Sequence, residues 1–408
     1  MLKFMEGGVC AAQGFQAAGI HVGVKTHASW KKDVALIVSD VDCAASAVFT
    51  KNVVKAAPIH VDKVHLADGK ARAIIANSGN ANACAPHGEE NAKKMCAAAA
   101  KAIGCKAEDV LVSSTGVIGQ TINIQAIEDG VPELYGALAR SAEASDAAAH
   151  AIMTTDTVKK EVAVETTVGG KTVRMGGIAK GSGMIHPNMA TMLVFLTTDA
   201  VISPAMLQKA LSGDIANTFN MLSIDGDTST NDMVTVLANG LAGNPTVDAE
   251  GEDFTAFMKA LNSVTIALCR KIAGDGEGAT KLLECKVSGA ADLDTAKTVA
   301  KSVICSSLLK AAMFGADANW GRVLCAIGYS GANVDVNKVD VAFHSAAGTV
   351  EVCKNGAGLD FSEEFAKKVL LEKEIEILVE LNSGEFSSTA WGCDLTYDYV
   401  KINGDYRT

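Results

Sequence analysis

The segment that most constrains this chain is a polar, glycine-rich stretch that runs without a break into a short apolar run. Residues 180–191, KGSGMIHPNMAT, lead directly into residues 192–196, MLVFL. A short apolar run that follows glycine and proline is typical of a strand buried inside a sheet. Thr191 therefore stands at the start of a predicted buried strand, directly after the small residue Ala190.

A threonine in this position can act as a self-processing nucleophile. Its hydroxyl can attack the carbonyl of Ala190 in an N-to-O acyl shift, and hydrolysis of the resulting ester would leave Thr191 as a new chain terminus. That terminus would carry an attacking hydroxyl and an α-amine with a reference pKa of about 8, so one residue could supply both nucleophile and base. The alternative is that Thr191 is only a β-branched residue that opens a strand.

Length and composition fit an enzyme of two domains. The chain has 408 residues, of which 49% are hydrophobic, which is too long for one ordinary core and apolar enough to fill two. A formal net charge of −11, with no Lys/Arg run longer than a pair, argues against nucleic acid or an anionic membrane as partner. No apolar run approaches the roughly 18 residues of a membrane span, and residues 1–6 lack the pattern of a signal peptide. We therefore expect a cytoplasmic protein.

The cysteines and histidines predict neither disulfides nor a metal centre. The eleven cysteines include no C-x-x-C pair, and the eight histidines lack the spacing of metal ligands. Most cysteines stand among apolar residues, as Cys325 does within residues 323–327, so we expect them to be reduced and buried. His186 lies five residues before Thr191 and is predicted to be a structural loop residue.

Helix signals recur along the chain. Residues 89–103 have the composition of a helix and are followed by Gly104, a typical terminating residue. Ser203 and Pro204 provide an N-cap and a first-turn proline for a second helix, which we expect to reach about Leu222.

Strand signals alternate with these helices, which predicts an α/β fold. Residues 374–381 alternate between charged and apolar side chains with nearly the period of a half-buried strand. Continuity is weakest near residues 274–286. We therefore predict a main catalytic domain over residues 1–285 and a smaller α/β domain over residues 286–408.

Short segments spread in order over nearly the whole chain carry a family pattern. They are GGVCAAQGF (7–15), ANSGNANAC (76–84), SSTGVIG (113–119), MTTDT (153–157), AKGSGMI (179–185), MATML (189–193), DGDTSTND (225–232), GEGATK (276–281), ADANWGR (316–322) and AWGCDLTYDYVKIN (390–403). In order and spacing they resemble the ornithine acetyltransferases, also called glutamate N-acetyltransferases or the ArgJ family. Two positions depart from the family pattern: Cys10 stands where threonine is expected, and residues 85–88 replace a Thr-Gly pair.

The resemblance implies a layered, N-terminal-nucleophile-like α/β fold with a second, smaller α/β domain, whose tail returns to the active site. It implies cleavage between Ala190 and Thr191 into an α and a β fragment, with two of each assembling into a heterotetramer. It also implies a reaction that needs no cofactor, because the energy of one amide is conserved in the other.

The resemblance also assigns residues to roles. Thr191 is the implied nucleophile, and Thr115 with Gly116 forms the implied oxyanion hole, where a hydroxyl and a backbone N–H can stabilise a tetrahedral intermediate. Within the implied substrate-binding set, Lys180 suits an α-carboxylate and Glu277 suits the side-chain amine of ornithine. That set is Thr154, Lys180, Thr191, Glu277, Asn403 and Thr408.

The implied reaction is a ping-pong acetyl transfer of arginine biosynthesis. Acetyl would pass from N2-acetyl-L-ornithine to Thr191 and then to L-glutamate, with acetyl-CoA as a possible second donor in this family. Two alternatives stay open. An N-terminal-nucleophile aminopeptidase or amidase would share the cleavage but pass the acyl group to water. An uncleaved amino-acid-binding protein would share only the fold.

Overall fold

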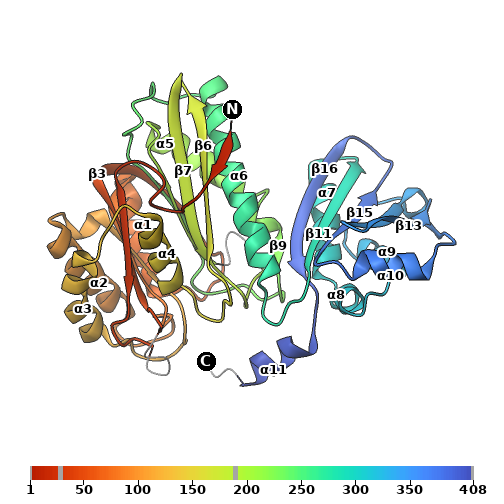
Figure 1. Cartoon of the computed structure of the whole chain (residues 1–408), viewed down its shortest axis with the longest axis horizontal. Coiled ribbons are helices and arrows are strands. Elements are labelled where there is room, and N and C mark those ends of the chain that lie inside the picture. Colours follow the sequence, from red (N-terminus) through yellow and green to blue (C-terminus); the bar gives the residue numbers. More distant parts are fainter. Residues whose placement is uncertain (1, 26–30, 187–191, 406–408) are drawn as a thin grey trace.

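The computed structural model describes residues 2–25, 31–186 and 192–405, and this part of the chain forms two β-sheets with helices packed around them (Figure 1). The larger sheet has nine strands and the smaller has seven. The predicted α/β class, with a second and smaller part of sheet and helices, is confirmed.

The larger sheet has the strand order β1-β6-β7-β8-β10-β3-β4-β5, and β2 pairs with the first half of the long strand β3. The pairs β8–β10 and β4–β5 are parallel, and the other pairs are antiparallel. The strands are β1 (Lys3–Met5), β2 (Phe15–Ile20), β3 (Val34–Phe49), β4 (Lys70–Asn77), β5 (Val110–Ser114), β6 (Lys160–Val168), β7 (Lys171–Lys180), β8 (Leu193–Thr198) and β10 (Met233–Ala238).

The smaller sheet has the order β14-β13-β12-β15-β11-β16-β9. Its edge strand β9 comes from the middle of the chain, and β11 spans the predicted domain boundary at residue 285, which stays a prediction. The alternating segment at 374–381 is confirmed as strand β15. The strands are β9 (Leu222–Ser223), β11 (Leu282–Ala290), β12 (Asp340–Ser345), β13 (Gly348–Lys354), β14 (Ala357–Gly358), β15 (Glu374–Glu380) and β16 (Phe386–Cys393).

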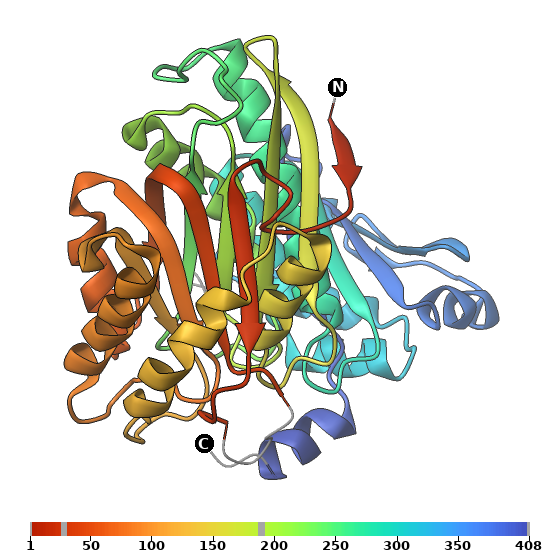
Figure 2. The ribbon, with the colours of Figure 1, turned by 60° about the vertical axis from the view of Figure 1, so that its left-hand side comes forward.

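Helices cover both faces of the larger sheet. Helix α4 (Ala142–Ala151) packs on one face, where Figure 2 shows it in front of the strands, and α5 (Pro204–Ile215) and α6 (Glu252–Gly274) pack on the other. Helix α6 lies between the two sheets (Figure 1). The remaining helices are α1 (Ala57–His65), η1 (Leu66–Asp68), α2 (Gly88–Ile103), η2 (Ala107–Asp109), α3 (Ile124–Gly136), η3 (Phe219–Met221), α7 (Leu293–Cys305), α8 (Ser307–Phe314), α9 (Trp320–Gly328), η4 (Val336–Lys338), α10 (Glu363–Leu370) and α11 (Tyr397–Asp405). None of the described helices combines the length and apolar character needed to cross a membrane.

The apolar run at 192–196 is confirmed as a buried strand, β8, in the interior of the larger sheet. Leu193 and Phe195 belong to the core under α4, whereas Val194 and Leu196 belong to the core under α5 and α6. Every residue of β8 is buried, because both faces of the sheet are covered. Ala190 and Thr191 lie outside the described residues.

Of the two helices predicted from sequence, one ends at the predicted residue and the other does not. Helix α2 ends as predicted before Gly104, whose φ of 82° is the left-handed conformation of a helix-terminating glycine. Helix α5 begins as predicted, since Ser203 Oγ accepts a hydrogen bond from the N–H of Met206 at 3.3 Å. Its predicted end at Leu222 is wrong. The helix stops at Ile215, and Leu222 pairs with Trp391 at the edge of the smaller sheet.

The prediction of a buried Cys325 is also wrong. Cys325 is exposed on α9, where Val323, Ala326 and Ile327 form the buried face. Apolar neighbours in sequence did not indicate which face of the helix the thiol occupies. All eleven cysteines are free, and six of them are buried.

Candidate active site

Six of the predicted site residues line one small cavity at the end of the larger sheet where β7 ends and β10 begins. The cavity has a volume of about 120 Å³. Ala190, Thr191 and Thr408 lie outside the described residues. The six residues are Thr115, Gly116, Thr154, Lys180, Glu277 and Asn403.

Lys180 is the cationic group of the cavity. It ends β7 opposite Leu193, the first residue of β8, and is only 8% exposed. Its Nζ lies 3.5 Å from Thr115 Oγ1. Burial lowers the pKa of the Lys180 ammonium, and the carboxylate of Asp156 opposes that shift. A buried ammonium without a close ion-pair partner in the described structure is suited to meet an anionic ligand.

Thr115 and Gly116 follow strand β5 and form a tight contact with residues 79–80. A Cβ on Gly116 would stand 2.7 Å from the carbonyl carbon of Gly79, and Gly116 has a φ of +127°, so only glycine fits here. The Thr115 N–H donates to the carbonyl of Asn77 at 2.9 Å. The donors that this pair can offer a ligand are therefore the Thr115 hydroxyl and the Gly116 N–H.

Glu277 is the anionic group of the cavity and is 9% exposed. It stands in a tight turn after α6, and its N–H donates to the carbonyl of Ser182 at 2.9 Å. The flanking Gly278 has a φ of +68° and packs against the backbone of Tyr399, where a Cβ would stand 2.6 Å from the nitrogen. This close packing brings α11 over the turn, so that Asn403 Nδ2 donates to Glu277 Oε2 at 2.8 Å.

The segment between Lys180 and the predicted cleavage site is fixed by side chains from the 223–228 region. The carboxylate of Asp225 accepts the N–H groups of Met184 at 2.6 Å and Ile185 at 2.8 Å. The carbonyl of His186 accepts from Thr228 Oγ1 at 2.8 Å. The His186 ring contacts Ser223 Oγ at 3.0 Å, and burial lowers the pKa of this imidazole to about 4, which keeps it neutral. A structural role for His186, as expected from sequence, fits these contacts.

Sequence reasoning missed seven further residues that line the cavity, among them Ser229, Thr230 and Asn231. Asn231 Nδ2 donates to the carbonyls of Ala81 at 2.5 Å and Ser114 at 2.7 Å, and so fixes the end of β5 beside Thr115. The available signal was a run of polar side chains directly before the apolar strand β10.

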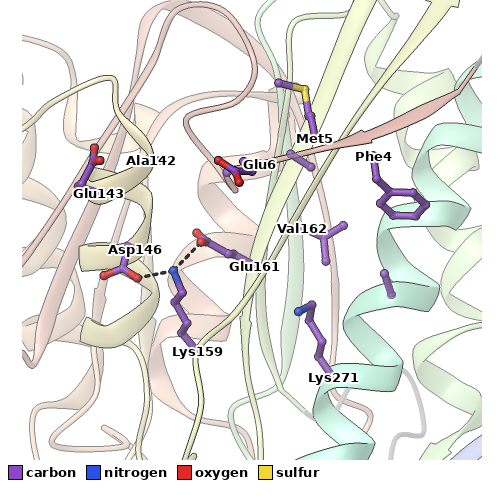
Figure 3. Close-up of a pocket in the computed structure, with 13 residues that line it drawn as sticks. Phe4, Met5, Glu6, Ala142, Glu143, Asp146, Lys159, Glu161, Val162 and Lys271 are labelled. Atoms are coloured by element: carbon purple, nitrogen blue, oxygen red, sulfur yellow. Dashed lines mark hydrogen bonds and ion pairs between the residues drawn. The ribbon is translucent and has the colours of Figure 1, made fainter.

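A larger hollow of about 740 Å³ lies beside β1 and α4 (Figure 3). Of the predicted site residues that the structure describes, none lines it. One of its ammonium groups, that of Lys159, is already paired with Asp146 and Glu161. We therefore assign the site to the smaller cavity. Across the described residues, no three His, Cys, Asp or Glu side chains gather as metal ligands.

A family model and the sequence relatives of this chain agree on one family. The ArgJ family model matches residues 16–408. The arginine biosynthesis bifunctional protein ArgJ of Caldanaerobacter subterraneus is 51% identical over 408 residues, which are all of both chains. A crystal structure of the ArgJ protein from Bacillus halodurans is 48% identical and covers 52% of this chain and 98% of its own, with a TM-score of 0.49.

A second solved relative is the ornithine acetyltransferase of Mycobacterium tuberculosis, crystallised with ornithine. It is 40% identical and covers 47% of this chain and 100% of its own, with a TM-score of 0.44. A family match over nearly the whole chain, together with a relative 51% identical over its full length, shows that this chain belongs to the ArgJ family and is an acetyltransferase of arginine biosynthesis.

Proposed function

We propose that the enzyme transfers acetyl from N2-acetyl-L-ornithine to L-glutamate through an acetyl ester on Thr191. The observation that carries this proposal is that a buried ammonium, Lys180, and a buried carboxylate, Glu277, line the same cavity of about 120 Å³. An amino acid with a cationic side chain complements these two charges, with its α-carboxylate at Lys180 and its side-chain amine at Glu277. The ornithine complex of the 40% identical relative supports this ligand class.

In the first half-reaction the Thr191 hydroxyl attacks the acetyl carbonyl and gives its proton to the α-amine of the same residue. The tetrahedral oxyanion would be stabilised by the Thr115 hydroxyl and the Gly116 N–H. The C–N bond then breaks, the proton passes to the departing nitrogen, and ornithine leaves. Glutamate's amine attacks the ester in the second half-reaction, which returns the hydroxyl and forms N-acetylglutamate. Burial of the cavity limits hydrolysis of the ester.

The nucleophile is created by cleavage of the bond between Ala190 and Thr191. We propose that the resulting fragments, residues 1–190 and 191–408, stay together and assemble as two copies of each. Acetyl-CoA is proposed as a second acetyl donor, because the 51% identical relative is named a bifunctional protein. Eleven free cysteines suit a reducing compartment, so we place the reaction in the cytoplasm.

Intact mass spectrometry before and after incubation with acetyl-ornithine tests the proposal directly. We expect two fragments, with one acetyl group added to the one that begins at Thr191. On addition of glutamate, N-acetylglutamate should equal the ornithine released. An amidase would instead release free acetate, and a binding protein would remain a single chain without turnover. Either result would overturn the proposed reaction.

A further inference from the structure

A fully buried ammonium lies behind the cavity. Lys160, the first residue of β6, is 0% exposed. Its Nζ lies 2.6 Å from Asp156 Oδ1 and 2.6 Å from Asp275 Oδ2. An ammonium that is removed from water is stable between two carboxylates, but loss of either carboxylate would leave a poorly compensated buried charge, which is strongly unfavourable.

The first carboxylate fixes two of the segments that line the cavity. Asp156 Oδ2 accepts the N–H of Thr154 at 3.0 Å, and its Oδ1 accepts the N–H of Gly181 at 2.7 Å. Thr154 and Lys180, the neighbour of Gly181, are both proposed substrate contacts. Burial opposes ionisation of Asp156, yet Lys160 and Lys180 hold its pKa at about 2, so it is negatively charged at every physiological pH.

The second carboxylate belongs to the segment that carries Glu277. Asp275 accepts the N–H and the hydroxyl of Thr157, and its backbone carbonyl accepts from Ser182 Oγ at 2.7 Å. The carbonyl of Ser182 in turn accepts the N–H of Glu277 at 2.9 Å. The segments 154–157, 180–183 and 275–277 are thus joined around one ammonium, and each of them carries one proposed substrate contact.

We propose that Lys160 is a positioning residue for acetyl transfer, which sets the spacing between Thr154, Lys180 and Glu277 through Asp156 and Asp275. Asp156 has a second role, because its negative charge keeps the Lys180 amine protonated, and therefore able to bind the substrate carboxylate. The inference rests on the proposed function, because it assumes that Lys180 and Glu277 bind the substrate.

The charges around Lys180 predict a pH signature. Burial lowers the pKa of Lys180, and the positive charge of Lys160 lowers it further. The negative charges of Asp156, Asp232 and Glu277 oppose this shift. Lys25 also lies within electrostatic range of Lys180. The charged form of Lys180 binds the carboxylate, so kcat/KM should fall as the pH rises through its pKa. Asp156→Asn should therefore move this alkaline limb to lower pH, and Lys160→Met should move it to higher pH.

The experiment compares kcat/KM against pH for acetyl-ornithine and for glutamate in processed wild-type, Lys160→Met and Asp156→Asn enzymes. The matched control is Lys354→Met, which removes an exposed lysine paired with Asp340 on the smaller sheet. Misplacement of substrate contacts typically costs about 100-fold in rate, so we expect losses of that order for both substrates with Lys160→Met, and none for the control.

Opposite shifts of the alkaline limb in the two variants would support the proposal, because a role in folding alone would lower activity at every pH without moving the limb. Unshifted limbs, or activity equal to that of Lys354→Met, would overturn it. If Lys160→Met does not fold, the nearly isosteric Asp156→Asn decides through the direction of its shift. Formation of acetyl-Thr191 by the wild-type enzyme is measured before any variant is compared. If the wild-type enzyme forms none, the proposed function is refuted, and not the role of Lys160.

Discussion

The carboxylate of Glu277 lies directly against Gly183, so that a Cβ on residue 183 would stand 2.4 Å from the carboxylate carbon. This contact joins the turn after α6 to the polar segment that follows β7. Substitution of Gly183 by alanine must therefore displace either the carboxylate or the backbone that lines the cavity.

Gly183→Ala should lower kcat/KM for acetyl-ornithine by about 10- to 100-fold, because the displaced carboxylate would no longer meet the side-chain amine that it is proposed to bind. Glutamate, which has no such amine, should be affected less. Gly213→Ala is the matched control, since a Cβ there meets nothing within 4 Å. Steady-state kinetics of both half-reactions provide the measurement. An unchanged Gly183→Ala enzyme would show that Glu277 is not held by this contact.

Glu277→Gln and Lys180→Met should separate the two ends of the substrate. The glutamine variant keeps the shape but loses the negative charge, so it should weaken acetyl-ornithine more than glutamate. The methionine variant removes the partner of a carboxylate that both substrates possess, so it should impair both half-reactions. A charge-assisted hydrogen bond lost from a buried site costs about 2 to 3 kcal/mol, or roughly 30- to 150-fold in kcat/KM.

Activity in these variants is normalised to processed protein, because Lys180 lies eleven residues before Thr191. Equal losses for both substrates with Glu277→Gln, or no loss with Lys180→Met, would contradict the orientation assigned to the substrate.

Thr191→Ala should remain one folded chain without measurable turnover, because it lacks the hydroxyl that the proposed acyl shift and acetyl transfer require. Thr191→Ser should retain part of both functions, since oxygen and amine survive. A denaturing gel and intact mass spectrometry measure cleavage, and product analysis measures turnover. Cleavage after Ala190 in the alanine variant would refute the proposed nucleophile.

Asp62→Asn should stabilise the protein at alkaline pH. Asp62 Oδ1 accepts the N–H of Val112 at 2.8 Å, but its buried Oδ2 has no hydrogen-bond partner in the described structure. Burial raises the pKa of Asp62 well above its usual range. The stability associated with its neutral form is fully present below an unfolded-state pKa of about 4 and is lost as the pH rises through the folded-state pKa.

The asparagine side chain stays neutral, so we expect it to add about 1 to 3 kcal/mol to the free energy of unfolding at pH 8 and less at pH 5. Urea unfolding at the two pH values measures the difference. The control is Asp360→Asn, at an exposed position. A variant that is no more stable than wild type at pH 8 would indicate that ionisation of Asp62 does not destabilise the folded protein.

Local sequence patterns were sufficient to predict elements whose burial follows a simple period. The apolar run of β8, the alternation of β15 and the glycine after α2 are each a local signal of the burial or the end of a single element. The end of α5 depended on a partner far along the chain, because Leu222 leaves the helix to pair with Trp391. The prediction that Cys325 is buried failed for a related reason, because a helix also exposes residues whose neighbours in sequence are buried.

The candidate site residues were predicted by resemblance, and local sequence patterns could not have predicted the network of ion pairs and hydrogen bonds around Lys160. Lys160 follows Lys159 in the chain, and the two look alike as a pair of surface lysines. Only the fold brings Asp275, 115 residues away, within 2.6 Å of Lys160 and buries that ammonium completely. Long-range ion pairs of this kind leave no periodic signal in a sequence.

The strand order of the larger sheet has a consequence for a chain cut ahead of β8. Strands β1 to β7 would all belong to one fragment, and the adjacent strands β8 and β10 to the other. Because β8 and β10 lie between β7 and β3, the first fragment alone would consist of two half-sheets with open hydrogen-bonding edges facing a gap. The second fragment fills this gap as an inserted two-stranded ribbon. Refolding of separated fragments would then be a second-order reaction, and the melting temperature of the cut enzyme would rise with its concentration, whereas that of the uncut chain would be independent of it.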